Sequence, residues 1–82
     1  MIVKATYLLG QEDKPELLEK TASGLQKCIE SNPDSLVLTT DDDKLIGHSI
    51  KAYVEEDHIA VEYECKEEYR EVLTKEGFIC LD

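Results

Sequence analysis

The chain has 82 residues, and 41% of them are hydrophobic. This is enough for a single small domain, over residues 1–82, with a hydrophobic core. Nineteen acidic residues against nine basic ones leave a net charge of -10. Because phosphate groups are bound by an excess of Lys and Arg, this balance argues against nucleic-acid binding and against adsorption to an anionic membrane. The apolar runs are far shorter than the roughly 20 residues that a membrane-spanning helix needs.

The first half of the sequence predicts a strand followed by a long helix. Residues 2–9 are rich in β-forming side chains and are followed by Gly10, as at the end of a strand. Asp13 and Pro15 then have the order of a helix cap and a first helical turn. Apolar residues recur at helical spacing up to residues 31–34, where Ser-Asn-Pro-Asp ends the helix.

The second half predicts a meandering sheet and a second helix. The expected elements are a strand over residues 35–40, a long strand over 45–55, its hairpin partner after a turn at 56–57, a helix over 67–76 and a short strand over 78–81. The order β-α-β-β-β-α-(β) predicts an α+β fold. We expect a two-layer sandwich in which a mainly antiparallel sheet has two helices on one face.

Two faces can be assigned from these periodicities. In the long strand we expect one buried face to carry Ile46, His48, Ile50, Ala52 and Val54. In the second helix we expect the inward residues to be Tyr69, Val72 and Leu73.

The three cysteines, Cys28, Cys65 and Cys80, are odd in number and contain no C-x-x-C pair. A small secreted domain has an even, dense set of cysteines, and a structural zinc site needs four closely spaced ligands. We therefore expect three reduced, buried thiols in a cytoplasmic protein. Enrichment in Lys and Glu, with few Asn and Gln, adds a bias that is typical of thermophiles.

The acidic residues gather in the predicted loops. If the first strand runs in the same direction as the hairpin strand after residue 57, the loops over residues 11–14, 41–44 and 66–68 meet at one end of the sheet. These loops carry the carboxylates of Glu12, Asp13, Asp41, Asp42, Asp43, Glu67 and Glu68. Oxygen ligands select hard cations, and an irregular site built from three loops suits Ca²⁺ better than Mg²⁺. The sequence thus predicts a divalent-cation site, with the three consecutive aspartates as ligands and the four other acids as supporting charge.

The same acids also have ordinary structural explanations. Asp13 fits a helix cap, Glu67 and Glu68 fit the first turn of a helix, and residues 41–43 fit a hairpin turn. This turn is not an EF-hand, because Ile46 stands where that motif requires glycine. Solvated acids without a metal therefore stay open as an alternative.

His48 lies between Ile46 and Ile50 on the expected apolar face. It is either a general base or ligand near a pocket, or a core histidine bonded to a backbone carbonyl. A Cys–His nucleophile pair would bring it beside Cys65, but no electropositive surroundings that would lower the thiol pKa are evident. We therefore do not expect an enzyme.

The alternative to a cation site is a protein-interaction module. An acidic face can mimic a nucleic acid or dock on a basic protein through electrostatically steered association. The surface in question is an exposed row of Lys51, Tyr53 and Glu55, with Glu62 and Glu64 on the neighbouring strand. If Tyr53 joined an apolar patch there, a dimer would follow. Otherwise the row is solvated, and we expect a monomer.

The turn Asp41-Asp42-Asp43, the pair Glu12-Asp13 and the Lys/Glu-rich, amide-poor composition resemble those of small acidic α+β proteins of methanogenic and thermophilic archaea. Some of those proteins are described as carrying an acidic, calcium-binding pocket. The resemblance covers the whole chain and implies Ca²⁺ as the bound cation, with no catalytic role for any residue. Calcium binding is therefore the first hypothesis, and a module for a basic protein partner is the second.

Overall fold

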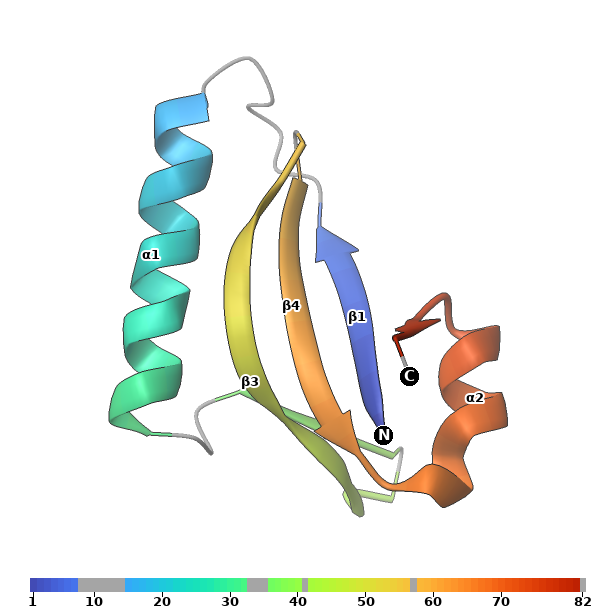
Figure 1. Ribbon diagram of the computed structural model, residues 1–82. Coiled ribbons are helices and arrows are strands. Elements are labelled where there is room, and N and C mark those ends of the chain that lie inside the picture. The colour runs from blue at the N-terminus through green and yellow to red at the C-terminus, as the bar shows by residue number, and fades with distance from the viewer. Residues whose placement is uncertain (8–14, 33–35, 41, 57, 82) are drawn as a thin grey trace.

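The computed structural model of the protein describes residues 1–7, 15–32, 36–40, 42–56 and 58–81. In chain order the elements are β1 (Ile2–Tyr7), α1 (Pro15–Ser31), β2 (Val37–Thr39), β3 (Leu45–Glu55), β4 (His58–Cys65), a 3-10 turn (Glu67–Tyr69), α2 (Arg70–Lys75) and β5 (Ile79–Cys80) (Figure 1). The predicted order of elements and the α+β class are confirmed.

The described strands form one antiparallel sheet in the order β2-β3-β4-β1-β5. Within it β1 runs antiparallel to β4, so that Val3 pairs with Tyr63 and Tyr7 pairs with Ile59. The assumption that these two strands run in the same direction is therefore wrong. The prediction fails because β1 is a central strand that pairs with both β4 and β5. The direction of such a strand depends on pairing between distant residues, which no local sequence pattern reveals.

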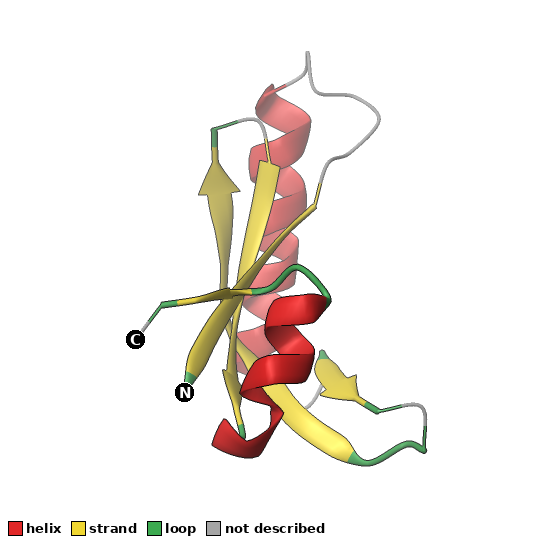
Figure 2. Ribbon diagram, turned by 90° about the vertical axis from the view of Figure 1, so that its right-hand side faces the viewer, coloured by secondary structure: helices red, strands yellow, loops and turns green. Residues whose placement is uncertain are grey.

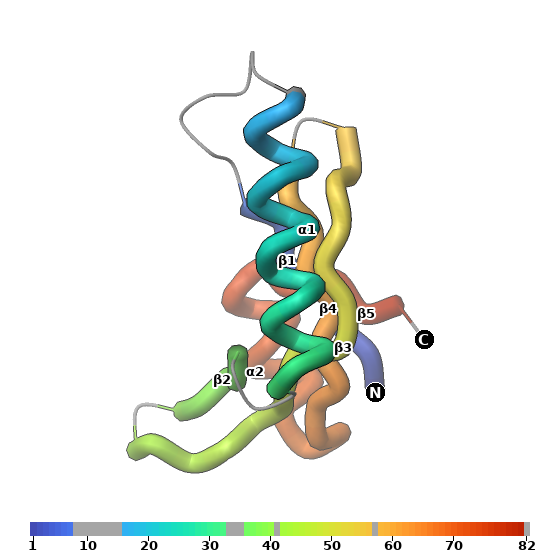
Figure 3. Tube along the Cα trace, turned by 90° about the vertical axis from the view of Figure 1, so that its left-hand side faces the viewer, coloured from blue at the N-terminus to red at the C-terminus, as the bar shows by residue number. Residues whose placement is uncertain are grey.

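One face of the sheet carries the core. The buried side chains that alternate along β4 are those predicted: Ile59, Val61, Tyr63 and Cys65. Leu18 of α1 and Leu73 of α2 belong to the same buried cluster, and the ring of Phe78 packs edge-on against Tyr63 with 6.1 Å between centroids. α1 lies along the sheet beside β3 (Figure 3), and the strong twist of the strands (Figure 2) lets α1 and α2 cover different ends of this face.

A β-bulge divides β3 into two halves. Ser49 pairs with Tyr63 and Lys51 pairs with Glu62, which leaves Ile50 as an extra residue between them. An extra residue in one strand bends it and changes which side chains face the core. The long β3 is curved in Figure 1.

The bulge overturns part of the predicted face of β3. His48 pairs with Glu64, whose side chain points away from the core, whereas Ala52 is buried and Val54 packs against the core. The prediction that His48 shares a face with Ala52 and Val54 is therefore wrong. A strict two-residue alternation fails across an inserted residue, because every later side chain changes sides.

Two smaller predictions also fail. Cys28 is exposed, because it lies one position away from the buried Ile29 on α1, and Val72 is 51% exposed, because Leu73 is the buried residue of the short α2. The other two thiols are free as well, and burial raises the pKa of Cys65.

Gly47 lies where β3 comes very close to β4, which makes it a test of the strand pairing. A Cβ added there would meet the carbonyl oxygen of Glu64 and would lie 2.6 Å from Cys65 Sγ. Because the backbone must shift, we expect Gly47→Ala to lower the free energy of unfolding by about 1–3 kcal/mol. Gly24→Ala is the matched control, since its added Cβ meets no atom within 4 Å on the exposed side of α1. It should raise stability by up to about 1 kcal/mol. Equal urea midpoints for the two variants would contradict the close approach.

Candidate functional site

The structure does not bring the predicted cation ligands together among the residues that it describes. Asp42 and Asp43 are exposed after β2, and Asp41 lies outside the described residues, as do Glu12 and Asp13. Within residues 1–7, 15–32, 36–40, 42–56 and 58–81, no three His, Cys, Asp or Glu side chains are grouped so that they could hold a metal ion.

The acids that follow β4 have a structural role in the first turn after the strand. Glu67 Oε1 lies 2.6 Å from Nη2 and 2.8 Å from Nε of Arg70, so it forms an ion pair within one turn. Glu68 is exposed beside it. This arrangement agrees with the structural explanation of these acids, in which the start of a helix favours negative charge.

The three acidic loops were expected to meet at one end of the sheet because β1 was assumed to run in the same direction as β4. The observed direction of β1 contradicts this assumption. β1 ends at Tyr7, which pairs with Ile59 at the start of β4, and the next described residue, Pro15, begins α1 at that same end of the sheet (Figure 1). Glu67 and Glu68 follow the opposite end of β4. The calcium-binding hypothesis itself stays a prediction.

His48 and Cys65 belong to opposite faces of the sheet. His48 is half-buried and pairs with Glu64, whereas Cys65 is buried on the core face opposite Gly47. His48 is therefore not a core histidine either. Beside it, Ser49 is 1% exposed and its Oγ has no hydrogen-bond partner among the described residues, which no sequence pattern predicts.

Two acids of the row on the outer face already bond to neighbouring side chains. Lys4 Nζ donates to both carboxylate oxygens of Glu55, at 2.8 and 2.9 Å. Tyr53 Oη donates to Glu62 Oε2 at 2.6 Å, and Lys51 Nζ lies 5.0 Å from the centroid of the Tyr53 ring. On this face Glu55 is therefore held in an ion pair and Glu62 in a hydrogen bond.

β3 has an edge that β2 leaves uncovered. β2 pairs with residues 45–48, and the backbone N–H of Ser49 donates to the carbonyl of Leu36 at 2.9 Å. Beyond Ser49, no strand in the described part of the chain pairs with this edge. An unpaired strand edge carries a row of backbone donors and acceptors that can pair with another chain.

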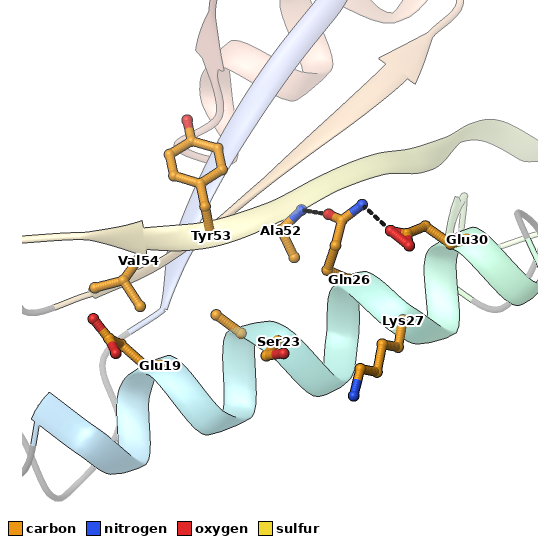
Figure 4. Close-up of a pocket in the computed structure, with 9 residues that line it drawn as sticks. Glu19, Ser23, Gln26, Lys27, Glu30, Ala52, Tyr53 and Val54 are labelled. Carbon is orange, nitrogen blue, oxygen red and sulfur yellow. Dashed lines mark hydrogen bonds between the residues drawn. The ribbon is translucent and has the colours of Figure 1, made fainter.

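A groove runs between this edge of β3 and α1. Its volume is about 530 Å³, and it is open to solvent. The sheet side consists of Ala52, Tyr53 and Val54, and the helix side consists of Glu19, Ala22, Ser23, Gln26, Lys27 and Glu30 (Figure 4).

Gln26 caps part of the open edge. Its Oε1 accepts a hydrogen bond from the backbone N–H of Ala52 at 2.8 Å, and its Nε2 donates to Glu30 Oε2 at 3.3 Å (Figure 4). The side-chain amide thus occupies the place that the carbonyl of a neighbouring strand would take. Val54, two residues further on, has its backbone N–H and C=O on the same edge as Ala52.

This groove is not evident from the sequence, because neither the edge nor Gln26 carries a motif. The one available signal was the unequal length of two predicted neighbouring strands, residues 35–40 and residues 45–55. A longer strand beside a shorter one must leave backbone groups for another partner or for water.

Comparison of the chain with protein-family models, with curated proteins and with solved structures gives no match. In the described part of the chain, none of the helices has the length and apolar character of a membrane span. The function is therefore argued from the groove and its charges.

The hydrogen bond to Glu62, together with desolvation and nearby negative charge, raises the pKa of Tyr53 from 10.0 to about 12. Folding therefore favours the protonated phenol. Its contribution to stability is complete below pH 10 and is lost as the pH rises towards 12. In ¹³C-tyrosine NMR we expect Glu62→Ala to bring this pKa back towards 10, while Glu64→Ala on the same strand leaves it unchanged. A Tyr53 titration that is the same in both variants would show that the bond does not form in solution.

Proposed function

We propose that this protein is an acidic binding module that takes an extended, basic segment of a partner protein along the open edge of β3. The observation that carries the proposal is the outer edge of β3 beyond Ser49, along which no described strand lies and which α1 flanks. Strand addition gives affinity through main-chain hydrogen bonds, and the walls of the groove give selectivity through side chains.

The charge of the groove favours a basic segment. Glu19 and Glu30 are exposed along its helix wall, where Lys27 is the one cation among the described lining residues. The net charge of -10 also steers basic partners towards the protein and raises their association rate at low salt. A second copy of this chain would instead bring the same negative charge to the groove, so a basic partner fits better than a homodimer.

The proposal moves the interaction site away from the surface that the sequence suggested. On the outer face, Glu55 and Glu62 already bond to Lys4 and Tyr53. Along the groove, by contrast, Val54 has backbone groups on an edge where no described strand lies. Main-chain pairing is available there without the loss of an existing ion pair.

The test is an amide NMR titration of the ¹⁵N-labelled protein with an extended Lys/Thr/Val peptide of about nine residues, a length that spans the open edge. We expect chemical-shift changes centred on residues 49–55 and on the groove side of α1. Two peptides with N-methyl groups on alternate residues should behave differently, depending on the phase of the methylation, that is, on which set of alternate residues is methylated. In one phase the methyl groups replace the N–H groups that bond to β3, and binding should be abolished. In the other phase they replace N–H groups that point away from β3, and binding should stay intact.

Charge screening alone would give a different result. Strand addition would be contradicted by shift changes of equal size at Asp42, Asp43, Glu67 and the groove. Such changes would not depend on which peptide residues are N-methylated, and they would be lost at high salt. A Val54→Pro variant, checked for its fold, removes one backbone donor from the open edge and should weaken the peptide without changing net charge.

A further inference from the structure

The helix wall of the groove has an acid near each end. Glu19, Ser23, Gln26 and Glu30 follow one another at intervals of four, three and four residues, so they form one stripe of α1. From Glu19 to Glu30 the helix axis advances by about 16 Å. Between the two acids the stripe has the uncharged side chains of Ser23 and Gln26, and Gln26 binds the backbone of Ala52. Lys27 also lines this wall, three residues before Glu30.

The order of this stripe along β3 follows from the contacts. Glu19 lies beside Val54, and Gln26 lies beside Ala52 (Figure 4). Glu30 lies further along α1 and lines a hollow together with Ile50 at the bulge. α1 therefore runs opposite to β3, with Glu19 at the Val54 end of the groove and Glu30 at the bulge end.

A strand added to this edge would send every second side chain towards α1. Residues that pair directly with Ala52 and Val54 share their side of the sheet, which is the side on which α1 packs. Along an extended chain, two positions span about 7 Å, four span about 14 Å and six span about 20 Å. Of these, a spacing of four is nearest to the about 16 Å between the two acids along α1.

We infer that the groove selects a segment with two Lys or Arg residues four positions apart, an inference that rests on the proposed function. The first of these residues binds Glu19 and the second binds Glu30. The segment runs antiparallel to β3, as all strands of this sheet do beside their neighbours. The residue midway between the two cations faces Ser23 and Gln26 and is small or polar.

Binding in this register exchanges one acceptor for another at Ala52. A carbonyl of the segment takes the N–H that Gln26 Oε1 now accepts, and the amide of Gln26 moves aside. Glu30 then exchanges its bond from Gln26 Nε2 for a charge-assisted bond from the second cation. When the segment binds, the two hydrogen bonds that Gln26 makes to Ala52 and Glu30 are thus replaced by bonds from the segment.

The test compares peptides of one composition whose two lysines are three, four or five positions apart, with affinity measured by fluorescence anisotropy. Spacings of three and five place the lysines on opposite faces of the strand. We expect the four-residue spacing to bind most tightly, by about threefold for each exposed ion pair gained.

Matched variants then assign each ion pair. Glu19→Gln and Glu30→Gln should each cost about threefold with the four-residue peptide, whereas Glu16→Gln, exposed on α1 outside the groove, should cost less. Replacing the first peptide lysine with Gln should abolish the effect of Glu19→Gln and retain that of Glu30→Gln.

The outcomes separate this inference from the proposed function. Equal affinity for all three spacings, or equal effects of Glu16→Gln, Glu19→Gln and Glu30→Gln, would overturn the spacing rule. If the shift changes still centred on residues 49–55, strand addition would stand without it. If no peptide changed the shifts of residues 49–55, the proposed function would fall, and the spacing rule with it.

Discussion

The unequal lengths of β3 and its outer neighbour are the constraint on which the site depends. β3 has 11 residues and β2 has three, so backbone groups of β3 extend beyond the strand that pairs with them. Backbone donors and acceptors need partners in protein or in water. The chain meets part of this need with Gln26 from α1. This helix packs beside β3 because its residues Leu18 and Ile29 are buried in the core. The groove is the space left between α1 and β3.

The bulge at Ile50 gives the two halves of β3 different roles. Before it, residues 45–48 pair with β2; after it, the edge lies beside α1. Such bulges, and charged residues such as Lys51, are devices by which natural sheets limit edge-to-edge association. Gln26 adds a third device, a side chain that imitates a strand carbonyl. An edge protected by one polar side chain is accessible to a segment that offers the same bond.

Local features of the sequence predicted most of the fold. Pro15 and Ser31 bound α1, and Leu45–Glu55 forms the long strand, because capping residues, turn residues and alternation act over a few neighbouring positions. The direction of β1 and the bulge at Ile50 were beyond this kind of inference, since each depends on pairing between residues distant in the sequence. The calcium hypothesis relied on that direction to join its loops.

The site was less predictable than the fold for the same reason. The acidic row on the outer face was visible in the sequence, but its ion pair with Lys4 joins positions 51 residues apart. The groove depends on Gln26, an ordinary helix residue until its amide is seen to reach Ala52. Functional surfaces built from a backbone edge leave almost no trace in side-chain identity, because every residue type supplies the same N–H and C=O groups.

Amide hydrogen exchange in the free protein tests the open edge most directly. Along β3, Tyr53 pairs with Ala60 and its N–H points towards β4, whereas the N–H of Val54 points to the open edge. We predict that Tyr53 exchanges slowly and Val54 rapidly, with Ala52 between them because Gln26 covers its N–H. Equal, strong protection of Val54 and Tyr53 would mean that the edge is already paired, and the strand-addition account would then be wrong.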